Sequence, residues 1–126
     1  MLMPPGFNTV TPNFMVNDAA ALVRFLIDGL GGVEVLRPDG AIANAQVRLG
    51  SSTVMISESS KDFPGMCASC YLYVDDADAA MARAIQAGAT QVMVVADQPY
   101  GDRQGGVKDA HGNLWWLSQR LVAGPY

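Results

Sequence analysis

The sequence predicts an α+β fold made of two tandem β-α-β-β-β modules that form a curved, partly open, barrel-like cleft. Two observations lead to this prediction. Residues 14–27 are echoed by residues 72–85 at an offset of 58, and residues 54–57 are echoed by residues 115–118 at an offset of 61. A unit of half the chain that occurs twice implies two like modules about a pseudo-two-fold axis. Any cleft between such modules would be lined by equivalent positions.

The first module is expected at about residues 7–57. Residues 9–16 are predicted to form a strand, in which Pro12 suits an edge or a strand start. Asp18 is the expected N-cap of a helix with apolar residues at helical spacing, and a glycine-rich stretch ends this helix near Gly29. The other strands of this module are expected at 33–37, 41–49 and 53–57, with turns at 38–40 and 50–52.

The polar segment 58–66 is interpreted as the linker to a second module at about 67–120. The same order of elements recurs there. A strand at 67–74 precedes a helix at 76–87, and the remaining strands are expected at 91–96, 101–108 and 114–119. The pair Gly105-Gly106 suits a β-bulge that bends its strand.

Length and composition exclude several classes of protein. A chain of 126 residues suffices for one domain with a real core, and 50% hydrophobic with 16% charged residues argues against disorder. The net charge of −4 and the lack of a Lys or Arg run argue against nucleic acid as a partner. The sequence shows neither an apolar run long enough to cross a bilayer nor a basic start followed by an apolar segment, so we expect a cytoplasmic protein with no membrane partner.

The two cysteines, Cys67 and Cys70, form a C-x-x-C pair. Such a pair can belong to a redox motif or to half of a zinc site. However, a strand is expected to follow it instead of a helix start, and cysteines three apart on a strand face opposite sides, too far apart for a disulfide without a bend. We expect two reduced thiols in or near the core.

Paired β-α-β-β-β modules of this length resemble the vicinal oxygen chelate superfamily, which includes glyoxalase I, extradiol dioxygenases and the fosfomycin and bleomycin resistance proteins. The stretch 100–116 reads Y-G-D-R-Q-G-G-V-K-D-A-H-G-N-L-W-W. It is similar to the Y/W-G-D-R…G…D-x-x-G-N-x-W pattern of the PhnB-like and bleomycin-resistance-like branch. The resemblance covers nearly the whole chain and implies the fold more strongly than a reaction, because this fold hosts several chemistries.

In metal-dependent members of that superfamily, each module supplies two His, Glu or Gln ligands from its first and last strands. The resemblance places these four positions at Thr11, Met55, Ser69 and Trp116. Hydroxyl, thioether and indole groups do not supply the imidazole or carboxylate ligands that a divalent cation needs. We therefore expect no metal and no other cofactor, which departs from glyoxalase and dioxygenase chemistry.

Alternation along the strands predicts which side chains share a face with those four positions. The resulting set is aromatic and sulfur-rich with hydroxyl and amide groups at intervals, which is typical of a small-molecule site. It is also compatible with side chains that simply fill a collapsed barrel core. The predicted ligand-binding residues are Thr11, Asn13, Met15, Met55, Ser57, Ser69, Tyr71, Tyr73, Tyr100 and Trp116.

Other chemically capable residues have plain structural explanations. His111 lies in a predicted turn, and the acidic cluster at 75–78 suits a helix start. Asp102 and Arg103 are adjacent on a strand, so only one can face the cleft, and Arg103 is favoured as the one that holds structure. Tyr100 can lie at the cleft rim or cap a hairpin. Glu58 would give one carboxylate near the site, which does not hold a catalytic metal.

These observations favour a metal-independent protein that binds a drug or an aromatic metabolite, because no constellation of His, Asp and Glu suggests catalysis. A lyase, isomerase or dioxygenase with atypical or no metal ligands is the alternative, and Glu58, Tyr100 or His111 are its candidate catalytic groups. A regulatory module with a degenerate cleft is a third possibility. The resemblance also implies a homodimer. The catalytic residues, if any, and the ligand remain open at this point.

Overall fold

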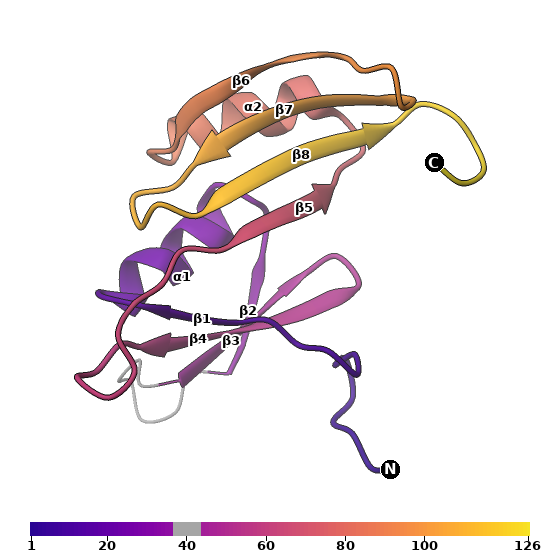
Figure 1. Cartoon of the computed structure of the whole chain (residues 1–126). Helices are drawn as coiled ribbons and strands as arrows, with labels where there is room; N and C mark the ends of the chain where they lie inside the picture. The colour runs from indigo at the N-terminus through magenta and orange to yellow at the C-terminus, as the bar shows by residue number, and fades with distance from the viewer. Residues whose placement is uncertain (37–43) are drawn as a thin grey trace. The chain divides into compact units, whose positions relative to one another are not determined.

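Each half of the chain folds as a β-α-β-β-β unit (Figure 1). The computed structural model describes residues 1–36 and 44–126, and the chain divides into the units Met1–Cys67 and Ala68–Tyr126. The elements of the first unit are β1 (Asn13–Val16), α1 (Ala19–Asp28), β2 (Val33–Leu36), β3 (Asn44–Leu49) and β4 (Ser52–Glu58). Those of the second are β5 (Ser69–Tyr73), α2 (Ala77–Gln86), β6 (Thr90–Asp97), β7 (Asp102–Lys108) and β8 (Leu114–Arg120).

Both sheets are mixed and have four strands in the same order, β1-β4-β3-β2 and β5-β8-β7-β6. The first and last strands of each unit run parallel, and the other neighbours are antiparallel. Asn13 lies opposite Met55, and Tyr71 lies opposite Trp116, which reproduces the sequence offsets of 58 and 61. The predicted α+β class and the repeated order of elements are therefore confirmed.

The core of the first unit lies between α1 and one face of its sheet. Leu22, Val23 and Leu26 of the helix are fully buried against a sheet face that includes Val47 and Ile56. Burial of each such side chain stabilises the fold by roughly 1.5–3 kcal/mol. Alternation along the strands then leaves the opposite sheet face without a helix, and we call this the helix-free face.

In the second unit α2 covers the corresponding face with smaller side chains. Its buried residues are Ala77, Met81 and Ala84, and they face strands that bury Val107 and Leu117. The small helix surface allows close packing, because a Cβ on Gly105 would lie only 2.7 Å from Cε of Met81. A larger residue at position 105 would therefore force Met81 and Val95 to shift.

The irregular strand of this sheet is β6, and not the strand that carries the glycine pair. Gly106 pairs with Met93 and Gln104 pairs with Ala96, so β6 uses more residues than β7 over the same length. The irregularity that was predicted at Gly105-Gly106 in β7 therefore lies in the neighbouring strand β6. The two glycines are explained by close contacts on opposite faces of the sheet.

Two predicted strands in the described residues begin at least two residues later than expected. The expected strand at 9–16 starts at Asn13, and the Thr11 hydroxyl, just before it, donates a hydrogen bond of 2.9 Å to the carbonyl of Asn8. The expected strand at 67–74 starts at Ser69, because the backbone N–H of Ala68 donates to the side chain of Asn113. The predicted turn at 38–40 and the ends of the flanking strands at 37 and 41–43 fall outside the described residues.

Both helices begin at the predicted aspartates. Asp18 accepts from the N–H of Ala21 at 3.3 Å, and Asp76 accepts from that of Ala79 at 3.1 Å. Asp18 does so with φ of 65°, in the left-handed region that L residues seldom adopt. Neither described helix is long and apolar enough to cross a membrane.

Candidate functional site

The helix-free face of the first sheet carries four of the predicted site residues. Asn13 and Met15 of β1 lie in register with Met55 and Ser57 of β4, so that they form one contiguous patch. The Ser57 hydroxyl donates to the side-chain oxygen of Asn13 at 3.0 Å. Thr11 precedes the strand and turns its hydroxyl to the backbone instead. The patch is thus two thioethers beside one amide–hydroxyl pair.

The helix-free face of the second sheet carries the aromatic residues. Tyr71 and Tyr73 of β5 are 53% and 58% exposed, and their rings meet edge to face with centroids 6.2 Å apart. Trp116 lies opposite Tyr71 on β8, and its indole N–H donates to the hydroxyl of Ser69 at 3.0 Å. Four predicted residues therefore form one surface.

A glycine on the neighbouring strand allows the indole of Trp116 to lie down on the sheet. A Cβ on Gly106 would lie 2.8 Å from Cζ3 of Trp116, which is closer than real Cβ contacts come. The same added atom would lie 3.2 Å from Cγ2 of Val92. The indole is therefore positioned by its bond to Ser69 on β5 and by its close approach to Gly106 on β7.

The four positions at which metal-dependent superfamily members carry ligands do not fit a cation. Ser69 and Trp116 use their polar atoms on each other, and the Thr11 hydroxyl is bonded to a carbonyl. The thioether of Met55 is a poor ligand for a hard cation. Across residues 1–36 and 44–126, moreover, no three His, Cys, Asp or Glu side chains are grouped so that they could hold a metal ion.

A buried polar network adjoins the aromatic surface on the same face. Asp102, Gln104 and Ser118 are fully or almost fully buried although they lie on the side of the sheet away from α2. The Ser118 hydroxyl donates to Oδ2 of Asp102 at 2.8 Å, and Nε2 of Gln104 donates to the Ser118 oxygen at 3.1 Å. The Tyr100 hydroxyl donates to Oε1 of Gln104. Buried polar groups of this kind are costly unless every one has a partner, and here each has one.

The segment 121–126 closes over this network. Nη1 of Arg120 donates to Oδ1 of Asp102 at 2.9 Å, and Nη2 donates to the carbonyls of Gly124 and Pro125. The Tyr126 hydroxyl donates to Oδ2 of Asp102 at 2.7 Å. The guanidinium carbon of Arg120 lies 4.3 Å from the centre of the Tyr126 ring.

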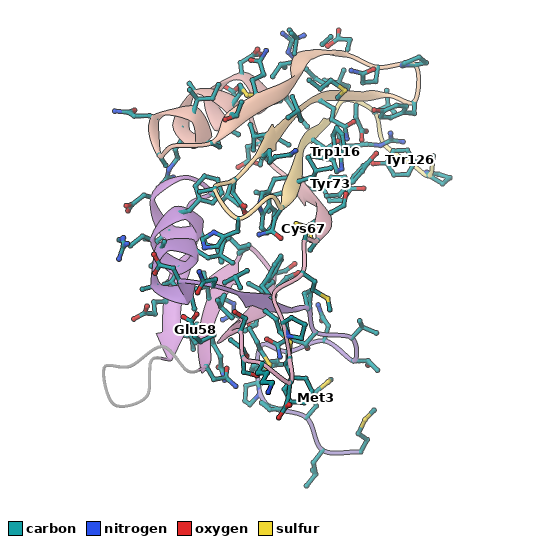
Figure 2. The ribbon with its side chains drawn as sticks, turned by 60° about the vertical axis from the view of Figure 1, so that its left-hand side comes forward. Met3, Glu58, Cys67, Tyr73, Trp116 and Tyr126 are labelled. Carbon is teal, nitrogen blue, oxygen red and sulfur yellow. The ribbon has the colours of Figure 1, made fainter. Side chains whose placement is uncertain are left out.

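Tyr73 joins the aromatic surface to the network. Its hydroxyl lies 2.7 Å from that of Tyr126, and Figure 2 shows the two side chains side by side. Tyr73 and Arg120 also line a cavity of about 290 Å³ with Val74, Asp75 and Gln119. This volume is close to the lower end of the range for ligand sites, roughly 300–1,000 Å³.

The network sets the protonation states of its acids. Burial by itself raises the pKa of Asp102, but hydrogen bonds from Arg120, Tyr126 and Ser118 outweigh it and lower that pKa below its ordinary value. The pKa of Tyr126 is raised, first by its hydrogen bond with Tyr73 and then by that with Asp102. Burial raises the pKa of Tyr100. The site thus combines a carboxylate with neutral phenols.

Several other candidates from the sequence have structural partners. Glu58 accepts from the N–H groups of Asp18 and Ala19 at the start of α1. The backbone of His111 belongs to a turn in which its N–H donates to Asp109. Arg103 forms ion pairs with Asp78 and Asp97, as expected of the structural member of its pair.

The expectation for the cysteines was wrong in one respect. Cys67 is exposed and lies before β5, outside any core, while Cys70 is half-buried on that strand. Neither forms a disulfide. Burial raises the pKa of the Cys70 thiol, which favours its unreactive protonated form.

Sequence reasoning selected Tyr100 and Tyr73 but not the buried residues Asp102, Gln104 and Ser118 with which they are linked. Alternation along the strands, continued from Ser118 and from Asp102, would have added Arg120 and Gln104 to that face. Tyr126 lies outside any regular element, so strand periodicity gives no information on where its side chain goes.

Comparisons with known proteins agree on one family. The model of the Glyoxalase/Bleomycin resistance protein/Dioxygenase superfamily matches residues 6–117. An uncharacterized protein of Mycobacterium bovis is 35% identical over 127 aligned residues, which cover 87% of this chain and 82% of the relative.

Solved structures show the same fold. TioX from Micromonospora sp. ML1 matches with a TM-score of 0.79 at 25% identity, covering 91% of this chain and 99% of TioX. TnmS3, an antibiotic binding protein from Streptomyces sp. CB03234, matches with a TM-score of 0.69 at 21% identity, covering 90% of this chain and 97% of its own. The second likeness concerns the fold alone.

Proposed function

Because the chain belongs to the glyoxalase/bleomycin resistance protein/dioxygenase superfamily, we propose that it is a metal-independent binding protein for a small, partly aromatic molecule such as a drug or an aromatic metabolite. The observation that carries this proposal is the helix-free face of the second sheet. There Tyr71 and Trp116 lie next to the buried network of Asp102, Gln104 and Ser118. Apolar walls with a few fixed polar groups are the usual composition of a ligand site.

The aromatic surface suits a planar ring. Tyr71 is half exposed. The indole of Trp116 is positioned by its bond to Ser69 and lies where a side chain at Gly106 would otherwise be. Offset stacking on such rings is worth about 0.5–1.5 kcal/mol each beyond the area that it buries. Because the rings are already oriented, little conformational entropy is lost on binding.

A second ligand-contacting surface is proposed on the first sheet. Met15 and Met55 offer flexible, polarizable contacts, and the hydrogen-bonded pair Asn13–Ser57 offers an amide and a hydroxyl beside them. The alanine variant Met55→Ala tests whether this patch contributes. If the patch contacts the ligand, Met55→Ala should lower the affinity of the protein for that ligand. If Met55 only fills space, the affinity should stay unchanged.

Metal independence is supported by the chemistry of the four corner positions, which supply hydroxyl, thioether and indole groups. Binding is favoured over catalysis because two of the candidate catalytic groups, Glu58 and Tyr100, are engaged in hydrogen bonds within the fold. Glu58 caps α1. The Tyr100 hydroxyl donates a hydrogen bond to Gln104, and burial raises the pKa of Tyr100. The fold neighbour TnmS3, described as an antibiotic binding protein, shows that this fold supports such a role.

Tryptophan fluorescence tests the proposal with a matched pair of variants. Trp116 lies on the helix-free face, whereas Trp115 is 2% exposed and donates to Asp109 on the other side. A panel of planar antibiotics and aromatic metabolites should contain a ligand that quenches the unchanged protein and Trp115→Phe but not Trp116→Phe. Absence of quenching throughout the panel would contradict the proposal.

Metal analysis completes the test. Binding should survive dialysis against EDTA, and the purified protein should contain no stoichiometric divalent ion. A bound ion that is required for binding would instead favour the enzyme alternative. We also propose a cytoplasmic homodimer as the working unit, by analogy with the superfamily, and sedimentation of the purified protein tests the dimer directly.

A further inference from the structure

The side chain of Tyr126 occupies a site that is built for a neutral phenol. Its hydroxyl donates to Oδ2 of Asp102 at 2.7 Å and lies 2.7 Å from the hydroxyl of Tyr73. Its ring lies on the guanidinium of Arg120 and meets the ring of Tyr100 edge to face at 6.4 Å. Four side chains from β5, the β6–β7 turn, β7 and β8 thus converge on one ring.

The acceptor in this site is also held by groups other than the phenol. Asp102 is fully buried, its Oδ1 is bonded to Arg120, and its Oδ2 is bonded to Ser118. A hydrogen bond to a charged acceptor in a water-poor site is among the stronger ones in proteins. The carboxylate is therefore fixed in place with one direction left for an external donor.

The surrounding charges select a neutral ring with a hydroxyl group. Asp102 and Arg120 carry opposite charges that offset each other, so the pair does not call for a charged ligand, and a phenolate would have no proton to donate to the Asp102 carboxylate. The electron-rich face of a phenol is attracted by the guanidinium of Arg120. The raised pKa of Tyr126 agrees with a preference for the neutral form.

The resident ring is bonded through its hydroxyl and lies on Arg120, but the segment that carries it is largely exposed, so a ligand that supplies the same contacts can replace it. Tyr126 is 68% exposed, and Leu121 and Val122 are 45% and 52% exposed. Residues 121–126 form no regular element, and Arg120 donates hydrogen bonds to the carbonyls of Gly124 and Pro125. A segment that buries so little surface gives up little hydrophobic stabilisation when it leaves.

We propose that Asp102, Arg120 and Tyr73 form a subsite for the hydroxyl-bearing ring of a phenolic ligand, and that Tyr126 fills this subsite when no ligand is bound. The inference rests on the proposed binding function and names the ligand class for it. The remainder of such a ligand can extend along Tyr71 and Trp116 or enter the 290 Å³ cavity that Tyr73 and Arg120 line. Ligand and Tyr126 then compete for the same acceptor.

The test uses p-cresol, which is the tyrosine side chain as a free molecule, and 4-methylanisole, which has the same shape but no donor. Binding is followed by the amide NMR signals of Asp102, Ser118 and Arg120. In Tyr126→Ala, p-cresol should shift these signals and bind at least tenfold tighter than to the unchanged protein. In the same variant 4-methylanisole should bind at least roughly tenfold more weakly than p-cresol, because it lacks the hydrogen bond.

Asp102→Asn in the Tyr126→Ala background should abolish the p-cresol shifts. Because Asp102→Asn also removes the buried partner of Arg120, the comparison of the two probes in Tyr126→Ala alone decides the matter, since only an exposed residue is changed there. Equal binding of both probes, or equal binding of p-cresol with and without Tyr126, would overturn the subsite. If p-cresol fails while planar ligands still quench Trp116, only the subsite is wrong; if both fail, the proposed function is wrong as well.

Discussion

Glu58 and Gln119 perform the same task at equivalent places in the two units. Glu58, at the end of β4, accepts a hydrogen bond of 3.0 Å from the N–H of the first residue of α1, and Gln119, near the end of β8, accepts one of 3.0 Å from that of α2. They are 61 residues apart, the same offset as the matched strands. The duplication thus kept a long-range helix cap and changed only its charge.

This relationship predicts the effect of removing each cap. Glu58→Ala leaves the N–H groups of Asp18 and Ala19 without this acceptor and should lower the free energy of unfolding by about 1 kcal/mol. Gln119→Ala should cost a similar amount. Glu58→Gln should cost less, about 0.3–1 kcal/mol, since only the interaction of the charge with the helix dipole is lost. Urea unfolding measures all three, and equal stability of Glu58→Ala and the unchanged protein would contradict the role.

Gly106→Ala should displace the indole of Trp116. The added Cβ would lie 2.8 Å from the ring, so the ring must tilt and break its bond to Ser69. We expect a loss of stability of roughly 1–3 kcal/mol and a changed Trp116 emission maximum. In Trp116→Ala the same glycine substitution should be nearly neutral. A double-mutant cycle measures this coupling, and additive effects would show that the contact is unimportant.

Asp109 organises the turn before β8. Its carboxylate accepts from the N–H groups of His111 and Asn113, from the Asn113 side chain and from the indole of Trp115 at 2.9 Å. Asp109→Ala leaves buried donors unpaired, and the expected loss in free energy of unfolding is roughly 2–3 kcal/mol. Its exposed neighbour is the control, since Lys108→Ala should stay within about 0.5 kcal/mol. Similar unfolding midpoints for the two variants would refute this role.

The lowered pKa of Asp102 predicts an acid-sensitive network. The group titrates below its ordinary value of 3.8 in the folded protein, so the unfolded chain binds more protons over that range and stability rises with pH. The contribution is complete above 3.8 and is lost as the pH falls through the folded pKa. The difference in unfolding midpoint between the unchanged protein and Asp102→Asn should therefore shrink between about pH 5 and pH 2.5. An equal difference in unfolding midpoint at both pH values would contradict the stabilising role of the Asp102 carboxylate.

The repeat in the sequence predicted the fold because equivalent positions in the two halves could be matched with each other. Matching Asp18 with Asp76 located both helix starts, and the two offsets reproduced the strand registers. Strand starts were less predictable. Pro12 and Ala68 have backbone bonds that depend on contacts with distant residues, such as the bond from Ala68 to Asn113, and local patterns do not contain these.

Alternation also gave part of the candidate surface. It put Tyr71 and Trp116 on one face, and the structure places them in register. It did not predict that the same face would bury a carboxylate, since an acidic residue on a strand is ordinarily assigned to solvent. The partner of that carboxylate, Tyr126, comes from an irregular segment whose path depends on Arg120. Only the folded chain brings these two residues together.

The trio Asp102, Gln104 and Ser118 could be exchanged for hydrocarbons. Ion pairs and hydroxyls shut away from water usually stabilise a protein no better than leucine or valine of similar volume would. Stability therefore does not explain why a natural sequence keeps such buried polar groups. More stable variants are commonly obtained by removing them at the expense of activity. Replacement of this trio together with its ion-pair partner Arg120 by hydrocarbon side chains should therefore give a more heat-resistant protein that lacks the ligand selectivity proposed above.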